Sequence, residues 1–399
     1  MKLLIIDEEF PYPLNTGKRI RSFHLARVLG QLHNVSYMAY GSENSSGYDF
    51  MRENLLNPVA VTPPDRRQSG PMFYWKLLLN LISRYPYIVT SHYTARFMNR
   101  LAALVAAEKF DCIICEWTPY AIFIKNLPNI KKIIVAHNIE SAIWKGYLSN
   151  ERNLLRKYYI ATQIKKVIRF EDSCFGWADG ATAVSSGDAD EIRKLKISYP
   201  VEVIDNGVDV NYFYPQDAAV NPDSLVFTGS MDWRPNQDAA IYFAHEIFPL
   251  VKKERSSIRA TFVGRNPSRK VKELENINGI TVTGTVDDVR PYIAQASVYI
   301  VPLRIGGGSR LKILEAMAMG KPVVSTTIGA EGLRVSDGKN ICLRDTPEAF
   351  AKEVVHLLDD RKARDILGEN GRRTVEQQYR WEELGRKLSE YVCRILSSR

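Results

Sequence analysis

The sequence is poor in cysteine and has no long hydrophobic run. Its 399 residues include five cysteines, an odd number scattered along the chain, which fits a reducing compartment better than a disulfide-stabilised secreted domain. No stretch approaches the roughly 18 uninterrupted apolar residues that a membrane-spanning helix needs. The apolar run at the beginning reaches acidic residues at Asp7, which is too early for a secretory signal peptide. We therefore expect a cytoplasmic location.

The sequence also lacks the motifs of a metal centre or a nucleophilic triad. No Cys/His cluster, P-loop or Ser-His-Asp ordering is visible. Cys112 and Cys115 form a CxxC within a strand-like run, where residues three apart face opposite sides, so we interpret both as core cysteines. Asp188 and Asp190 spell a DxD, but at the expected start of a helix, where acids complement the dipole. We expect no metal site and no divalent-ion requirement.

The net charge of +9 is unevenly placed. Residues 1–200 hold 26 Lys+Arg and 18 Asp+Glu, or +8, while the remainder holds 28 and 27, or +1. A basic first half indicates an anionic partner. Nucleic acid is disfavoured because no zinc-finger, helix-turn-helix or RNP-like motif is present. An anionic lipid surface, a pyrophosphate-linked acceptor and a merely solvated surface all stay open.

Short apolar runs alternate with helical patterns, which is typical of βα units around parallel sheets. Strands are expected at 2–7, 35–40, 111–116, 132–136 and 181–184 in the first half, and at 201–204, 225–228, 258–263, 280–283, 298–301 and 322–326 in the second. Helices are expected at 19–32, 94–107, 154–174, 238–252, 289–295, 309–319, 347–359, 362–373 and 381–397. The predicted fold class is α/β, with two doubly wound Rossmann-like domains joined near 195–213 and facing a central cleft.

The run from Ile305 to Val324 is the most informative segment for function. It combines a tight glycine loop, an expected N-cap serine, a short helix and a buried strand, and its loop residues are Gly306, Gly307, Gly308 and Ser309. Glycines before a helix N-terminus let an anion approach backbone N–H groups, and the helix dipole favours a phosphate there. An ordinary Gly-rich turn is the alternative interpretation.

Three charged side chains favour the nucleotide interpretation of this loop. Arg310 and Lys312 place positive charge on the first turn of the helix, which opposes the dipole unless an anion binds there. Glu315 is a lone carboxylate among apolar residues, and it suits a bidentate acceptor for two neighbouring ribose hydroxyls. Together these residues predict a nucleotide site.

The segment resembles the donor-site signature of retaining, nucleotide-sugar-dependent glycosyltransferases of the GT-B fold, in the large bacterial group 1 (family four) class. That signature has a Glu, seven residues, and a second Glu followed by Ala-Met-Ala-x-Gly. Glu315 and the helix up to Gly320 match it, whereas Gly307 stands at the position of the first Glu and Arg310 where Gly is usual. The resemblance extends over most of the chain, through residues 11–29, 204–215, 227–243 and 282–303. It implies an acceptor domain at 1–200, a donor domain at 201–378, and a helix at 379–399 that packs back towards the first domain.

The resemblance also implies roles for residues of the first domain. His137 ends an apolar run where a strand is expected to emerge, and a lone His is more often structural. In the resembling enzymes, however, a His at this strand end contacts the transferred sugar. Glu140 is implied in acceptor binding. Gly17 and Lys18 lie in a loop that faces the donor diphosphate and the acceptor, and Gly17 is assigned to the donor and Lys18 to the acceptor.

In the second domain the resemblance pairs Arg234 with Lys312 at the pyrophosphate, since an arginine fork suits oxyanions. Gly229 precedes this loop, and Asn236 is expected to cap the next helix. Val286 lies in the loop that resembles the base-recognition segment. The implied catalytic set is thus His137, Arg234 and Lys312, and the other donor residues support the nucleotide.

The implied activity is transfer of a sugar, with retention, from a UDP- or GDP-type donor to a hydroxyl of a glycan or lipid-linked glycan in cell-surface polysaccharide synthesis. No cofactor beyond this donor substrate and no nucleic acid is expected. Two alternatives stay open. A nucleotide-sugar epimerase shares the fold but needs carboxylates beside the sugar, and a non-catalytic nucleotide-sugar-binding protein would fit the absent first Glu.

Residues 70–81 gather Met72, Phe73, Tyr74, Trp75 and three consecutive leucines, and nearby basic residues are Arg66, Arg67, Lys76 and Arg84. Aromatic and apolar residues flanked by positive charge are typical of an interfacial helix. We therefore expect the first domain to contact the inner face of the membrane peripherally. A helix packed on the domain core is the alternative.

Overall fold

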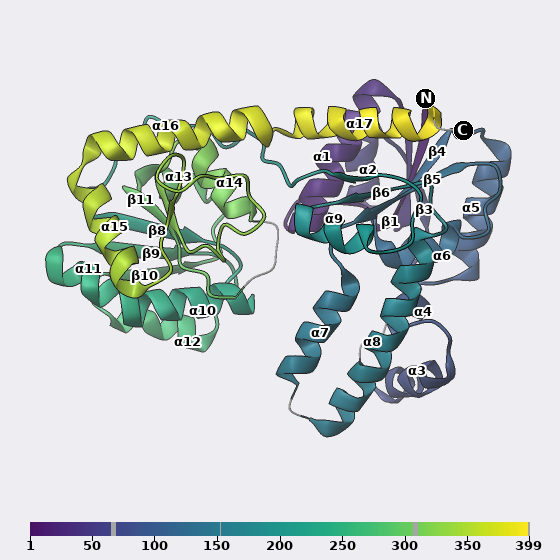
Figure 1. The fold of residues 1–399 in the computed structure, drawn as a ribbon, viewed down its shortest axis with the longest axis horizontal. Helices are drawn as coiled ribbons and strands as arrows, with labels where there is room; N and C mark the ends of the chain where they lie inside the picture. The colour runs from purple at the N-terminus through teal and green to yellow at the C-terminus, as the bar shows by residue number, and fades with distance from the viewer. Residues whose placement is uncertain (65–68, 152, 306–309, 398–399) are drawn as a thin grey trace. The chain divides into compact units, whose positions relative to one another are not determined.

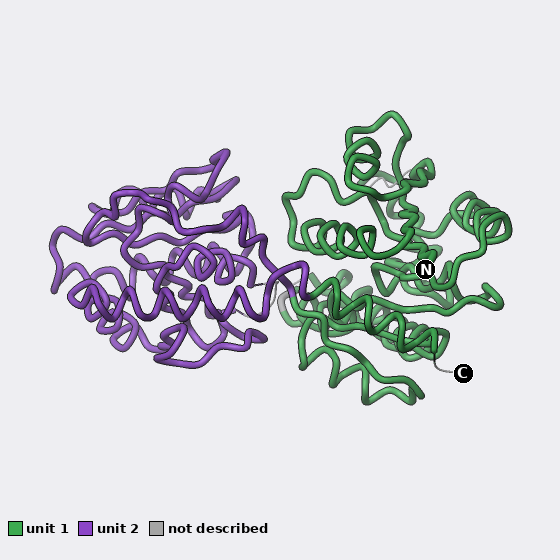
Figure 2. Tube along the Cα trace, turned by 90° about the horizontal axis from the view of Figure 1, so that it is seen from above, with its two compact units in different colours: residues 1–205, 384–399 green, residues 206–383 purple. Residues whose placement is uncertain are grey.

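The computed structural model describes residues 1–64, 69–151, 153–305 and 310–397. The chain forms two compact units, which Figure 2 shows in different colours. Residues 1–205 and 384–399 make the first unit, and residues 206–383 make the second. Within the described ranges, no helix combines the length and apolar character needed to cross a bilayer.

The first unit is built on a seven-stranded parallel sheet of order β3-β2-β1-β4-β5-β6-β7. Its strands are β1 (Lys2–Glu9), β2 (Asn34–Tyr40), β3 (Asn57–Val61), β4 (Cys112–Cys115), β5 (Lys131–Ala136), β6 (Gly180–Ala183) and β7 (Val201–Val203). The strand order reverses between β1 and β4. Ligands of such sheets bind beyond the carboxyl ends of the strands at this switch point, so residues at the ends of β1, β4 and β5 are candidates for a binding site.

The helices of the first unit are α1 (Gly17–Leu32), α2 (Ser46–Glu53), α3 (Pro71–Ile82), α4 (Tyr87–Thr90), α5 (Ala95–Ala107), α6 (Ala121–Ile124), α7 (Glu140–Asn150), α8 (Leu154–Phe175) and α9 (Ser186–Arg193). Figure 1 shows α7 and α8 extending together away from the sheet, with α3 beside α8. Both cysteines of β4 are buried and unpaired, which confirms that they are core residues.

The second unit contains a six-stranded parallel sheet of order β10-β9-β8-β11-β12-β13. Its strands are β8 (Ser224–Thr228), β9 (Arg259–Val263), β10 (Ile280–Gly284), β11 (Val298–Val301), β12 (Val323–Ser325) and β13 (Cys342–Leu343). The helices are α10 (Arg234–Tyr242), α11 (Phe248–Glu254), α12 (Arg269–Lys272), α13 (Arg290–Gln295), α14 (Leu311–Ala318), α15 (Pro347–Asp359) and α16 (Arg361–Gln378). The order reverses between β8 and β11.

The last helix, α17 (Trp381–Ser397), contributes its residues from Leu384 onward to the first unit. Tyr391 fixes it to the sheet, because its hydroxyl donates to the carbonyl of Pro200 at 2.6 Å and accepts from the backbone N–H of Ala181 at 2.9 Å. The Lys387 ammonium donates to the carbonyl of Val203 at 2.7 Å. The helix therefore secures the edge formed by β6 and β7.

The two parallel, doubly wound sheets confirm the predicted α/β fold class. Several elements differ from expectation, and β13, α2 and α7 are among those that were not predicted. Residues 57–61 form a strand that was not predicted, because Pro58 argues against a strand and is tolerated here only since β3 is an edge strand. Residues 201–203 pair with β6 in the first sheet and do not open the second. The helix expected at 238–252 begins at Arg234 and contains a π-helical segment at 243–247.

Candidate active site

In the loop after β8, the backbone of Gly229 lies close to the side-chain amide of Asn236 and the side-chain nitrogen of Lys312. Gly229 has a φ of 151°, and a Cβ there would lie 2.7 Å from Lys312 Nζ and 2.8 Å from Asn236 Nδ2. The loop after β9 approaches equally closely, since a Cβ on Gly264 would lie 1.7 Å from the Gly229 carbonyl oxygen. Only glycine fits at these two positions without displacing the neighbouring groups.

Asn236 positions the ammonium group of Lys312. The Lys312 Nζ donates to Asn236 Oδ1 at 2.6 Å and lies 4.2 Å from the centroid of the Phe227 ring. The Asn236 Nδ2 donates in turn to the carbonyl of Ser230 at 2.8 Å. The expectation that Asn236 caps a helix was wrong, because α10 begins two residues earlier and Trp233 occupies the N-cap position. Asn236 instead orients the lysine.

Lys312 and Glu315 lie three residues apart on α14 and have strongly perturbed acidities. Burial lowers the pKa of Lys312 to about 7, although the nearby carboxylate acts in the opposite direction. Burial likewise raises the pKa of Glu315 to about 7, against the effect of Lys312. Both shifts are typical of charged groups that are held out of water before their ligand arrives. An anion beside Lys312 would restore its positive charge.

Arg310 occupies the N-cap position of α14 in a left-handed conformation, with a φ of 52°. Its guanidinium lies against Glu331, with Nη2 3.1 Å from Oε2, and the side chain is nearly buried. Arg310 thus pairs with Glu331, a carboxylate of the same unit. Gly306, Gly307, Gly308 and Ser309, which were expected to cradle the anion, lie outside the described residues.

Two further predicted donor residues lie on the same edge of the second sheet. Arg234 is the first residue of α10 and is exposed. Val286 follows β10 and is half-buried, packed against the core of the unit. Gly229 and Val286 lie in the loops after β8 and β10, while Arg234 and Lys312 lie in the first turns of α10 and α14, so all four follow the carboxyl end of a strand.

In the first unit, charged side chains gather where β1, β4 and β5 end. The Asp7 carboxylate accepts from Lys18 Nζ at 2.7 Å and from the Tyr37 hydroxyl at 2.6 Å. The Glu116 carboxylate accepts from the Ser22 hydroxyl at 2.9 Å. Both acids are almost completely buried. These two carboxylates lie beneath the surface at the carboxyl ends of β1 and β4.

The basic side chains at the start of α1 are neutralised within the unit, which was not foreseen. Lys18 pairs with Asp7, and Arg19 pairs with Glu9 at 2.6 Å. Burial lowers the pKa of Lys18, but the adjacent Asp7 and Glu8 outweigh this effect and raise it overall. These charges therefore stabilise the loop that carries Gly17, which is the first residue of α1 and partly exposed.

His137 immediately follows β5, and its side chain is 8% exposed. Its Nε2 lies 3.0 Å from Glu116 Oε2. Burial acts to raise the pKa of Glu116, but the hydrogen bond and charge of His137 outweigh it, so this pKa is lowered. The carboxylate partner fixes the orientation of the ring and accepts from Nε2.

Glu140 begins α7 and is buried. Its carboxylate accepts from the indole N–H of Trp117 at 2.7 Å. Burial, reinforced by Glu171, raises the pKa of Glu140 to about 7 against the effect of Trp117. The Glu171 carboxylate accepts the backbone N–H groups of Glu140 and Ser141, at 2.7 and 3.2 Å, and so caps the helix. Glu140 can thus change protonation near neutral pH.

Sequence reasoning missed Asp7, Glu8, Glu116 and Tyr37. The signal for the acids was present, since Asp7 and Glu116 each directly follow four apolar residues of a strand or its end. The partners of these acids could not be read from the sequence, because β1, β4 and β5 are adjacent only through pairing of distant segments.

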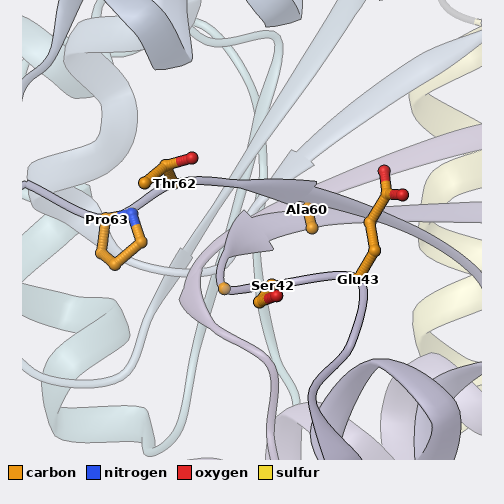
Figure 3. A pocket seen from close by; sticks show the side chains of 6 residues that line it. Ser42, Glu43, Ala60, Thr62 and Pro63 are labelled. Carbon is orange, nitrogen blue, oxygen red and sulfur yellow. The ribbon is translucent and has the colours of Figure 1, made fainter.

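Two cavities open near this edge of the first sheet. The larger, about 780 Å³, is lined by Glu8, Phe73, Lys76, Leu79, His92 and Trp144, among others. At its polar end the Nε2 of His92 lies 3.0 Å from Glu8 Oε1. A smaller cavity of about 500 Å³ lies beyond β2 and β3, between Ser42, Glu43, Thr62 and Pro63 (Figure 3).

Among the described residues, no group of three or more His, Cys, Asp or Glu side chains is arranged to hold a metal ion. Asp188 and Asp190 lie on α9, as expected from their place in the sequence. Asp188 accepts from the Ser185 hydroxyl at 2.6 Å, and Asp190 pairs with Arg193 at 2.8 Å.

Two family models match the chain in succession. A model described as Glycosyltransferase Family 4 matches residues 20–212, and one described as Glycosyl transferases group 1 matches residues 222–360. An uncharacterized 44.6 kDa protein in the cps region of Klebsiella pneumoniae is 21% identical over 392 residues, which cover 95% of this chain and 96% of that protein.

A GDP-mannose-dependent alpha-(1-6)-phosphatidylinositol monomannoside mannosyltransferase of Mycobacterium tuberculosis is 24% identical over 305 residues, which cover 66% of this chain and 78% of the relative. The solved structure of Anabaena HepE in complex with UDP and glucose is similar with a TM-score of 0.66 and 13% identity, over 98% of this chain and 99% of that one. This likeness concerns the fold.

Proposed function

Because this chain belongs to the retaining GT-B glycosyltransferases of group 1 and family 4, which use nucleotide sugars, we propose that it transfers a sugar to a hydroxyl of a glycan or lipid-linked glycan in cell-surface polysaccharide synthesis. The relative from a cps region supports the pathway class, and the relative that acts on a phosphatidylinositol mannoside supports a lipid-linked acceptor. The donor is a nucleoside diphosphate sugar of the UDP or GDP type, as in the names of the similar proteins.

The observation that carries this proposal is the Lys312 ammonium, held by Asn236 over the open backbone of Gly229. An ammonium placed beside a glycine turn can contact a diphosphate directly. In the reaction it stabilises the negative charge that develops on the departing diphosphate, and an exposed Arg234 adds a second cation. Glu315, one turn along α14, accepts hydrogen bonds from ribose hydroxyls. Gly306, Gly307, Gly308 and Ser309 stay predicted donor residues and lie outside the described residues.

Residues of the first unit are proposed to act on the sugar and the acceptor. His137, fixed by Glu116 at 3.0 Å, contacts the transferred sugar. Glu140 has a pKa of about 7, which suits a carboxyl that exchanges a hydrogen bond with an acceptor hydroxyl. Gly17 leaves room for the donor, and Lys18 lies beside the acceptor.

The test is incubation of the purified protein with labelled UDP- and GDP-sugars, with and without an extract of lipid-linked glycans. A transferase forms a labelled glycolipid only when acceptor is present, and NMR of the product shows a retained anomeric configuration. The epimerase alternative gives product from donor alone, and the non-catalytic alternative gives none. Lys312→Met should abolish transfer, while Lys253→Met, which removes an exposed lysine of α11, should leave it unchanged.

A further inference from the structure

Helix α3 presents its apolar side to solvent. Met72, Trp75 and Leu78 are 56%, 57% and 58% exposed, and Ile82 is 88% exposed. Among the residues of α3, the buried one is the polar Asn80. A helix that belongs to a protein core shows the reverse pattern, with leucines buried and amides in water. These exposures argue against the alternative interpretation, in which this helix packs on the domain core.

Polar contacts of Asn80 attach α3 to the unit in this orientation. The Gln163 side chain of α8 donates to Asn80 Oδ1 at 2.9 Å, and Asn80 Nδ2 donates to the Thr90 hydroxyl at 2.9 Å. Lys166 donates to the carbonyl of Leu81 at 3.1 Å. Because buried amides lose free energy when unpaired, this network favours one orientation of α3. These contacts therefore hold the apolar side of α3 towards solvent.

A second apolar surface lies on the same projection of the first unit, where α7 ends and α8 begins (Figure 1). Leu154, Leu155 and Tyr158 are 81%, 83% and 71% exposed, and Tyr147 of α7 is 56% exposed. Large apolar side chains that gather on an exposed surface often mark an interaction site.

The charge along these segments is mostly positive, with Glu151 as an acid just before α8. Residues 66–107 include six arginines or lysines and no acid. The basic residues Arg156 and Lys157 are exposed on the first turns of α8, next to Leu154 and Leu155. Apolar side chains interleaved with cations match the chemistry of an anionic bilayer, in which acyl chains lie beneath negative head groups.

We propose that α3 and the first turns of α8 form a docking surface for an anionic lipid bilayer, with α3 lying in the plane of the interface. A helix of 12 residues is only about 18 Å long, so it inserts its exposed side without spanning. The cavity lined by Phe73, Leu79 and His92 starts at this helix and reaches Glu8 at the edge of the sheet. An acceptor anchored in the bilayer would therefore enter the first unit beside α3.

Docking is measured without donor or acceptor, so its outcome is independent of the proposed reaction. The purified protein is sedimented with vesicles of phosphatidylglycerol and phosphatidylcholine, or of phosphatidylcholine alone. We expect binding to the anionic vesicles at low salt, weaker binding at 0.5 M salt because surface charge is screened, and little binding to the neutral vesicles. Trp75→Ser combined with Leu78→Ser should weaken the partition about tenfold.

The matched control is Tyr214→Ser combined with Ile366→Ser, which removes an aromatic and an aliphatic side chain, 46% and 49% exposed, from the second unit. This control should bind as the wild type does, and thermal melting should show that both variants are folded. The proposal is overturned if the wild type stays in the supernatant with anionic vesicles at low salt, or if both variants lose binding equally. A dimer in light scattering that dissociates in the Trp75 and Leu78 variant would assign the surface to a second copy instead.

Discussion

At the scale of single residues, buried groups that titrate near neutrality are the most informative features of this protein. Lys312, Glu315 and Glu140 each have a pKa of about 7. Such values are common where a ligand or a proton must arrive to complete a site. Proton uptake on ligand binding and the pH dependence of unfolding therefore report on these residues separately from overall activity.

The first prediction concerns the uptake of a proton at Lys312. At pH 8 its amine is largely neutral in the empty protein, because its pKa is about 7, and a bound diphosphate favours the ammonium. Binding of UDP or GDP should therefore take up close to one proton, and affinity should fall by up to about tenfold per pH unit above 7. Calorimetry in two buffers of different ionisation enthalpy measures this uptake. Equal heats in both buffers, for a nucleotide that binds, would contradict it.

The second prediction concerns the stability cost of ionising Glu140. Its folded pKa of about 7 lies above the usual value of 4.5, so the folded state favours the neutral carboxyl. The contribution of the neutral Glu140 carboxyl to the free energy of unfolding is complete below about pH 4.5 and is lost as pH rises through 7. Glu140→Gln keeps an oxygen for Trp117 and should be about 2–3 kcal/mol more stable than the wild type at pH 8 but not at pH 4.5.

Urea denaturation at the two pH values measures this difference. Glu53→Gln, which changes an exposed carboxylate of α2, serves as the control and should differ little from the wild type at either pH. A Glu140→Gln variant with the same advantage at both pH values would show that ionisation of Glu140 is not the cause.

At the scale of elements, α17 illustrates how a helix made late in the chain stabilises a sheet made early. Tyr391→Phe removes both hydrogen bonds of the hydroxyl, to Pro200 and from Ala181, while preserving the ring. The buried N–H of Ala181 then has no hydroxyl partner, so we expect a loss of about 1–3 kcal/mol in the free energy of unfolding. Tyr147→Phe, on an exposed tyrosine, should cost little. Urea melts of the two variants make the comparison, and equal midpoints would refute this role.

The elements themselves were largely predictable from the sequence, and their partners were not. Apolar runs bounded by turns located β8, β9 and β11 because buried parallel strands leave that pattern. The start of α10 was misplaced although Pro235 in its first turn marked it. The position of His137 directly after a strand could be predicted, but its contact with Glu116 depends on the pairing of β4 with β5. The contact of Arg310 with Glu331 likewise joins segments that no local pattern connects.

At the scale of the whole molecule, the chain passes from the first unit to the second near Asp205 and returns near Leu384. The uneven charge has a structural counterpart, because the basic residues around α3 and α8 belong to the first unit. Lys312 and Glu315, whose pKa values burial shifts to about 7, belong to the second unit. The proposed lipid-docking surface therefore belongs to the first unit, and the proposed diphosphate and ribose contacts of Lys312 and Glu315 belong to the second.

The return of α17 to the first unit also sets an order of events during synthesis. Residues 384–397 follow the 178 residues of the second unit, and translation at about 5–20 residues per second takes roughly 10–40 s to produce these. For that interval the nascent first unit lacks the helix that covers β6 and β7, while the second unit can already fold. The unit translated first is therefore the one that matures last, and chaperones would meet it with the α17 side of its sheet uncovered.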